Sequence, residues 1–304
     1  MSRFHDAVDD YLTIRRSLGY RLERHGRLLP DFADHLDRTG VATITIEHAL
    51  AWATSPEGQP ANWCAERLSI VRGFATWLAA ADPSVEVPPS DLLAWRPRRA
   101  VPHLFSTEQI AALLAATGRI RSCWRAATFH TLTGLLAVTG MRIGEALALD
   151  RDDFDAHLGR VVVRSGKFGK ARQLPLHATT GAALADYLVL RDEQQRGRDT
   201  TALFVSLHDG RLSYGAARDG FRQLVATAGI TPRPGARPPR LHDLRHSFVV
   251  NTVLDAYRTG ADVQALLPTL STYLGHVDPA ATYWYLSAAP ELLALAGERL
   301  EETS

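Results

Sequence analysis

Apolar residues in the first eighty positions recur every three to four residues, which is the spacing of helices with one buried face. Glycine and polar residues separate these segments, and Thr45 is a suitable N-cap for one of them. The predicted helices are Phe4–Leu18, Leu28–Leu36, Ile46–Ala53 and Trp63–Ala81. We therefore expect a helical N-terminal domain over residues 1–82.

Proline interrupts the helical pattern after this domain. Five prolines fall between Asp82 and Pro102, and proline disfavours continued helix. The stretch predicts an interdomain linker over residues 83–103, followed by a second domain over residues 104–304.

The second domain opens with a helix start, because Ser106 followed by Gln109 forms a capping-box pattern. Further helices are predicted at Trp124–Val138, Ala182–Arg191 and Tyr214–Ala228. Short apolar runs at Val161–Val163 and Gln173–Leu176 predict two strands of a hairpin, and Pro268 predicts a helix break. The expected fold is mainly α with a small antiparallel β-sheet.

Composition excludes several classes of protein. The content of 46% hydrophobic and 22% charged residues is typical of globular proteins, and no apolar stretch approaches a membrane span. The start of the chain does not resemble a signal peptide, so we expect a cytoplasmic protein without a membrane partner. Cys64 and Cys123 lack a CxxC partner, which argues against a thiolate zinc site, and we expect both to be buried.

Positive charge is local, because the whole chain carries a net charge of only +1. Residues 15–27 contain five arginines and one glutamate, a net +4, and residues 160–172 carry a net +5. Each run alone is typical of a solvated face, but several together favour a phosphate-rich partner.

The chain has only two lysines, Lys167 and Lys170, both at the tip of the predicted hairpin. An ammonium group can release its proton when its surroundings lower its pKa, whereas arginine keeps its proton. The pair therefore suggests a proton donor. The alternative is a solvated turn that holds two lysines by chance.

Three further segments carry candidate chemistry. Arg142 follows a glycine that ends one helix and stands near the start of the next, where its planar fork can bind a phosphate. His242 and Arg245 are three residues apart and share one helix face. Tyr285 stands nine residues after His276, which closes a Leu-Gly-His segment.

In this order, the segments resemble the tyrosine recombinase family of phage integrases, Xer-like recombinases and mobile-element recombinases. The family pattern is an arginine in TGxR, a hairpin lysine, HxxR, an LGH box and a tyrosine nine residues further on. The resemblance covers Phe105–Leu286, and the run from Leu266 to Tyr285 is most similar to transposon-borne members. The matching residues are Arg142, Lys167, His242, Arg245, His276 and Tyr285.

The resemblance implies a catalytic role for these residues. Tyr285 would attack the scissile phosphate and form a 3′-phosphotyrosine, while Lys167 would protonate the departing 5′ oxygen. The arginines and His276 would neutralise charge on the phosphate, and His242 would take the tyrosine proton or orient the phosphate. Glu145, one turn beyond Arg142, would hold that arginine in place. Lys170 remains the alternative proton donor and Tyr283 the alternative nucleophile.

The resemblance also implies a fold and partners. The N-terminal helices would be a core-binding, SAM-like DNA clamp, and residues 104–304 an α/β catalytic domain. Separately, the apolar pattern over Pro290–Leu300 predicts an amphipathic C-terminal helix that docks on a neighbouring protomer or on its own domain. We expect a homotetramer that binds double-stranded DNA sites and forms a Holliday junction between them. Sister recombinases or accessory proteins would be further partners. No cofactor or metal is expected. The predicted DNA contacts are Arg15, Arg16, Arg24, Lys170, Arg172 and Arg240.

Two other functions remain open at this stage. A type IB topoisomerase uses a similar set of residues to relax supercoils as a monomer. A regulator that has lost catalysis would bind DNA without cutting it.

Overall fold

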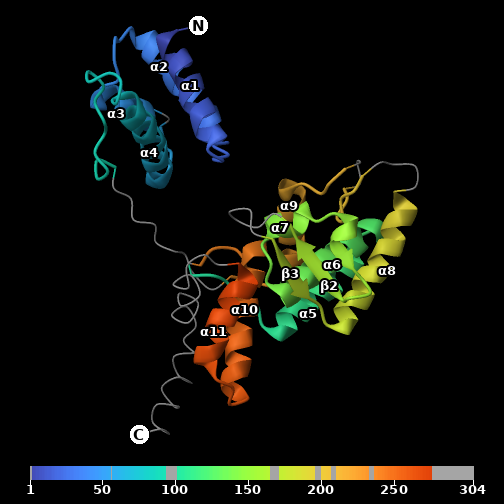
Figure 1. The fold of residues 1–304 in the computed structure, drawn as a ribbon. Helices are drawn as coiled ribbons and strands as arrows, with labels where there is room; N and C mark the ends of the chain where they lie inside the picture. Colours follow the sequence, from blue (N-terminus) through green and yellow to red (C-terminus); the bar gives the residue numbers. More distant parts are fainter. Residues whose placement is uncertain are drawn as a thin grey trace, which may run out of the picture. The chain divides into compact units, whose positions relative to one another are not determined.

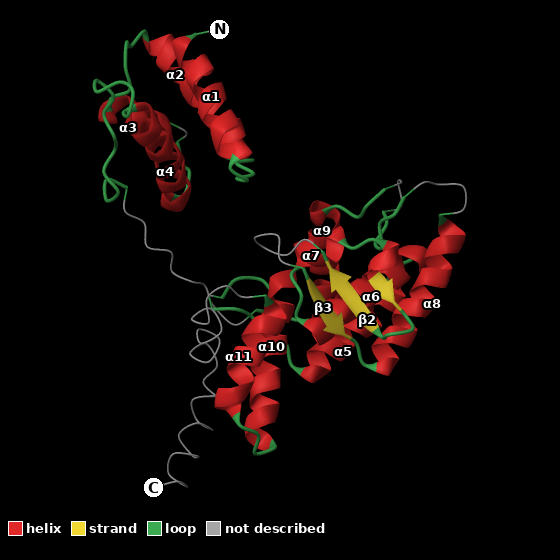
Figure 2. Ribbon diagram, in the orientation of Figure 1, coloured by secondary structure: helices red, strands yellow, loops and turns green. Residues whose placement is uncertain are grey.

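The computed structural model describes residues 2–55, 57–93, 101–164, 171–195, 200–206, 210–232 and 236–275. The chain forms two compact units, Met1–Arg99 and Ala100–Ser304, which are described separately below (Figure 1). Most of the described residues are helical, and the strands form one small sheet (Figure 2). The predicted fold class is confirmed.

Four helices form the first unit, and the predicted helices match them in order. They pack around a core that includes Phe32, Trp52 and Phe74, each at most 2% exposed. As predicted, Thr45 is an N-cap, and its hydroxyl accepts from the His48 backbone amide at 3.3 Å. The helices are α1 (Arg3–Ser17), α2 (His25–Thr39), α3 (Ile46–Thr54) and α4 (Ala61–Leu78).

Part of the stretch predicted as linker packs on this first unit. Val85 is 7% exposed and belongs to the core of the unit. Arg72 of α4 donates to the Pro88 carbonyl at 2.8 Å and to the Pro89 carbonyl at 2.9 Å. α4 ends at Leu78, before Pro83, and the chain beyond it still packs on the helical bundle up to Leu93.

The second unit is built around one central helix, α6, against which most of the other helices pack. The capping box predicted for α5 is confirmed, because Ser106 Oγ accepts from the Gln109 amide at 3.2 Å. The helices of this unit are α5 (Thr107–Ala116), α6 (Cys123–Thr139), α7 (Ile143–Ala148), α8 (Ala178–Gln194), α9 (Tyr214–Thr227), α10 (Leu241–Arg258) and α11 (Val263–Leu274).

A three-stranded antiparallel sheet lies in the same unit, in the order β1 (Phe154–Asp155), β2 (Arg160–Val163) and β3 (Arg172–Pro175). The predicted hairpin corresponds to β2 and β3, whose last described pair is Val163 with Arg172. The segment that contains both lysines joins these two residues, and positions 165–170 lie outside the described residues. Arg172 is the first residue of β3, and its pairing with Val163 fixes its position.

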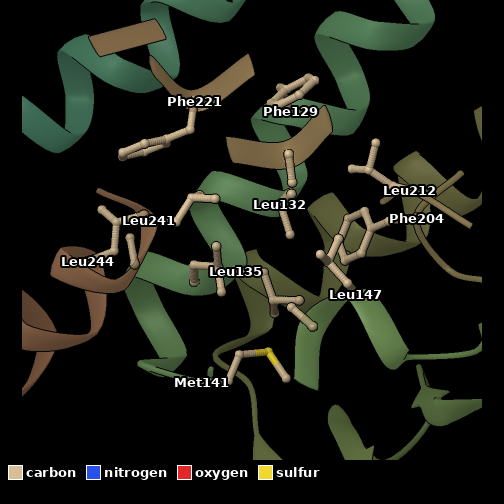
Figure 3. Close-up of a cluster of buried hydrophobic side chains, with 14 of the residues drawn as sticks. Phe129, Leu132, Leu135, Met141, Leu147, Phe204, Leu212, Phe221, Leu241 and Leu244 are labelled. Carbon is tan, nitrogen blue, oxygen red and sulfur yellow. The ribbon is translucent and has the colours of Figure 1, made fainter. Parts of the chain in front are cut away.

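The core of this unit fixes the residues that flank the candidate site (Figure 3). Met141 is 2% exposed, Leu241 is 6% exposed and Leu244 is fully buried. These side chains immediately neighbour Arg142, His242 and Arg245 in the sequence. Close packing of the core thus holds the backbone from which the three polar side chains extend.

Pro268 does not break its helix, contrary to the sequence-based expectation. Residues on both sides of it continue α11, although proline has no amide hydrogen to donate to the preceding turn. Asp262 caps the start of the helix, Gly275 caps the end, and one face is buried against α10. This capping and burial outweigh the loss of a single hydrogen bond.

Both cysteines lie outside the buried core. Cys123 is exposed and Cys64 is only partly buried, so the expectation that both lie in the core was wrong. Cys123 is the first residue of α6, a position at the surface end of a helix.

Among the described helices, none combines the length and apolar character that crossing a membrane requires.

Candidate active site

Arg142 extends from a tight junction between α6 and α7. Gly140 ends α6 in the left-handed region with φ 59°, and a Cβ at this position would lie 2.4 Å from the Phe248 ring. Glycine is therefore required both by its backbone conformation and by the close approach of the ring. The chain then turns so that Arg142 stands directly before α7, where its side chain is 26% exposed.

Arg245 lies beneath this junction. The residue is 2% exposed and donates to the Gly140 carbonyl at 2.8 Å and to the Leu274 carbonyl at 2.9 Å. It thus ties the end of α6 to the end of α11 from its own helix, α10. Arg142 donates to the same Leu274 oxygen at 3.5 Å and to the Gly275 carbonyl at 3.3 Å. Two predicted catalytic arginines therefore meet at one carbonyl oxygen.

His242 stands one turn before Arg245, at the start of α10. Its side chain is exposed on one side, and on the other its ring meets the His246 ring edge to face at 4.8 Å between centroids. Partial desolvation, followed by the positive charge of Arg245, lowers the pKa of His242 below its usual value. The ring is therefore neutral at pH 7 and can accept a proton.

Glu145 binds Arg142 from the first turn of α7. It accepts from the Arg142 backbone amide and from the Arg142 guanidinium, each at 2.9 Å. Burial opposes ionisation of this carboxyl group, but hydrogen bonds from Arg172 and Arg142 outweigh it and lower the pKa of Glu145 to about 2. The sequence predicted that Glu145 would hold Arg142, and the two residues do form an ion pair.

Arg172, one of the predicted DNA contacts, binds groups inside the protein. Its side chain is 13% exposed and its guanidinium binds Glu145 and the Tyr273 carbonyl inside the protein. The sequence carried one signal for this orientation. Arg172 and the buried Leu174 are two residues apart on β3, so they face the same side of the strand.

The other predicted DNA contacts among the described residues lie at the surface. Arg15 is half-buried over the Tyr20 ring, with Cζ 4.2 Å from its centroid, and Arg16 is exposed. Arg24 forms an ion pair with Glu66. Arg240 is 48% exposed and pairs with Asp243 at 3.3 Å. These residues remain predictions, and Lys170 lies outside the described residues.

Three of the predicted catalytic residues also lie outside the described residues: Lys167, His276 and Tyr285. The described chain ends at Gly275, directly before His276, with its carbonyl hydrogen-bonded to Arg142. The structure therefore brings together Arg142, His242 and Arg245. Within the described ranges, no three His, Cys, Asp or Glu side chains gather closely enough to hold a metal ion.

The chain is similar in sequence to known integrases and recombinases. The sequence pattern of the phage integrase family matches residues 104–291. The chain is 44% identical to the provisionally named integrase/recombinase y4rB of Sinorhizobium fredii, over 99% of this chain and 98% of that protein. It is 32% identical to tyrosine recombinase XerD of Mycobacterium tuberculosis, over 91% of this chain and 90% of XerD.

A solved structure shares the fold. The crystal structure of a lambda integrase tetramer bound to a Holliday junction aligns with a TM-score of 0.61 at 18% identity, covering 92% of this chain and 76% of the integrase. The family pattern matches more than half of the chain, and both relatives are similar to it over most of their length. The chain belongs to the phage integrase family of tyrosine recombinases.

Proposed function

We propose that this chain is a site-specific DNA recombinase that cuts and rejoins strands through a 3′-phosphotyrosine and a Holliday junction. The observation that carries the proposal is the meeting of Arg142 and Arg245 at the Leu274 carbonyl, with His242 one turn away on α10. Fixed guanidinium groups at one point suit the non-bridging oxygens of a phosphodiester, where charge develops in the transition state.

The proposed reaction exchanges one phosphate ester for another. The Tyr285 oxygen forms a bond to phosphorus, the bond to the 5′ oxygen breaks, and His242 takes the tyrosine proton. Lys167 gives a proton to the departing oxygen, with Lys170 as the alternative donor. Arg142, Arg245 and His276 neutralise the phosphate oxygens. Attack by a free 5′ hydroxyl from another strand reverses the steps and joins new partners.

The proposed assembly is a tetramer on two double-stranded DNA sites. Support comes from the lambda integrase tetramer, whose crystal structure holds a Holliday junction and shares this fold. We propose that the N-terminal unit of this chain grips DNA through Arg15, Arg16 and Arg24, and that the chain acts in the cytoplasm, where chromosomal and element DNA are accessible. Integration, excision, resolution and transposition all use this chemistry.

Covalent trapping tests the proposal and identifies the DNA sequence that the protein cuts. Sheared genomic DNA from the source organism is incubated with the protein and quenched in detergent, and DNA bound to protein is sequenced. A duplex of the enriched sequence, nicked beside the cleavage point, then serves as a suicide substrate. Wild type should form a covalent adduct, and Tyr285→Phe should form none.

Matched variants and products separate the alternatives. Tyr283→Phe should keep the adduct, and loss of the adduct in Tyr283→Phe but not in Tyr285→Phe would reverse the choice of nucleophile. Lys167→Ala should recover its cleavage rate on a 5′-bridging phosphorothiolate, whose sulfur leaves without a proton. Relaxation of plasmid by a wild type that never joins two sites would favour the topoisomerase function instead.

A further inference from the structure

Each nitrogen of the Arg172 guanidinium donates a hydrogen bond to a group within the second unit. Its Nε donates to the Tyr273 carbonyl at 3.0 Å, while Nη1 and Nη2 donate to the two oxygens of Glu145 at 3.1 and 2.7 Å. The bidentate pair is the strongest geometry that an arginine and a carboxylate can form. With its side chain 13% exposed, Arg172 has little surface left for a phosphate.

Glu145 is shared between Arg172 and Arg142. Each carboxylate oxygen accepts one hydrogen bond from each arginine, because Oε1 also binds the Arg142 guanidinium and Oε2 the Arg142 amide, both at 2.9 Å. Glu145 is only 6% exposed, so water supplies little of its solvation. Removing Arg172 would leave a buried carboxylate with Arg142 alone, and a buried charge without its full set of partners is costly.

The same guanidinium also supports the end of α11. It binds the Tyr273 carbonyl, and a Cβ on Gly275 would lie 3.2 Å from Arg172 Nη1. Gly275 has φ 67°, the left-handed conformation that ends the helix, and its carbonyl binds Arg142. Arg172 therefore contacts the last turn before His276 as well as the carboxylate that holds Arg142.

We propose that Arg172 is a positioning residue for strand cleavage, which holds Arg142 through Glu145 and the end of α11 through Tyr273, and does not bind the DNA phosphate. This assignment rests on the proposed function. A single side chain at the start of β3 would thus set the geometry of two predicted catalytic groups. Small displacements of positioned groups reduce reaction rates by about 100-fold.

The test compares Arg172→Ala and Arg172→Lys with wild type on the nicked duplex identified by trapping. The single-turnover cleavage rate at saturating DNA should fall about 100-fold in Arg172→Ala, with the DNA dissociation constant and its salt dependence almost unchanged. Arg172→Lys should recover part of the rate, because an ammonium supplies charge but not the fork. Arg218→Ala removes an exposed arginine of α9 and should match wild type in every measurement.

The pH profile separates positioning from general loss of structure. Without Arg172, Glu145 loses the largest of the hydrogen bonds that keep it ionised, so its pKa rises. Relative to wild type at each pH, cleavage by Arg172→Ala should therefore weaken further as the pH falls and recover partly as it rises. Glu145→Gln has no carboxyl group to titrate at this position, so its rate relative to wild type should be low at all pH values. The double variant should lose less than the product of the two single losses, since both changes break the link through Glu145 and only the contact with the Tyr273 carbonyl is lost in addition.

Three results would overturn the assignment. One is a wild-type rate in Arg172→Ala. Another is an unchanged rate at saturating DNA with weaker binding and a salt slope reduced by about one, which would make Arg172 a phosphate contact. The last is a double variant in which the two losses multiply. If wild type itself forms no adduct, the proposed function fails, which is a separate outcome.

Discussion

At the corner between α1 and α2, arginine side chains reach into water, whereas around the start of α10 they turn onto buried protein oxygens. Arg16 is exposed, and Arg24 is 57% exposed while paired with Glu66. Arg245 is 2% exposed with two carbonyl acceptors. An exposed surface cation suits steering and phosphate binding, and a buried, hydrogen-bonded one suits a transition state, because its geometry is set before the reaction.

Burial alone does not mark a site, as Arg67 of the first unit shows. It is 5% exposed and stacks on Trp52, with Cζ 3.6 Å from the ring centroid, and on Trp63 at 4.5 Å. It also donates to the Trp52 carbonyl at 2.9 Å. Arg67 is thus held by aromatic faces inside the bundle, whereas Arg142 and Arg245 meet each other. The candidate active site differs from the surroundings of Arg67 because two arginines there bind the same carbonyl oxygen.

The largest effect is expected for Arg245→Ala. Cleavage at saturating DNA should fall about 10²–10³-fold, as for loss of one oxyanion donor. The free energy of unfolding of the second unit should fall by about 1–3 kcal/mol for the loss of the donor to the Gly140 carbonyl, while the Leu274 carbonyl keeps its hydrogen bond from Arg142. Single-turnover trapping and calorimetry measure the two losses.

Arg67→Ala is the matched control, since it also removes a buried arginine. It should destabilise the first unit and leave the cleavage rate at saturating DNA close to wild type. Equal loss of cleavage in both variants would mean that burial, and not convergence, explains the effect of Arg245.

An intermediate effect is expected from the titration of His242. Its pKa is lowered, so the acidic limb of kcat/KM for cleavage should be centred below pH 6.5, where the ring gains a proton. The pH dependence of the folding stability has the same direction. Folding favours the neutral ring, so this contribution is complete above pH 6.5 and is lost as the pH falls through the lowered pKa.

His242→Gln provides the control for the pH profile. It should be slower at pH 7 and should lack the acidic limb assigned to His242. A wild-type limb centred above pH 6.5, or an unchanged limb in the variant, would remove His242 from the role of proton acceptor.

The smallest effect is expected at the surface of the first unit. Arg16→Ala should weaken DNA binding a few-fold and reduce the slope of log Kd against log salt by about 0.9, the change for one phosphate contact. Cleavage at saturating DNA should be unchanged. Arg38→Ala, an exposed arginine at the other end of α2, should leave the slope as in wild type. If Arg38→Ala lowers the slope as much, the corner is not the binding surface.

Local patterns in the sequence were enough to locate most elements. The capping box at Ser106, the N-cap at Thr45 and the paired strands β2 and β3 were all predicted, because each depends on residues close together in the chain. The break predicted at Pro268 was wrong because it weighed one lost hydrogen bond without the burial of α11. Burial depends on partners distant in sequence, which local patterns do not contain.

The family, the order of the candidate residues and the identity of Glu145 as a partner of Arg142 follow from the sequence, since these depend on residue type and spacing. What each arginine binds is known only from the folded chain. Arg172 counts as one more charge in a basic run, yet β3 turns it inward onto Glu145 and the end of α11. Charge is a property of the residue, whereas its acceptor is supplied by segments that meet only when the chain folds.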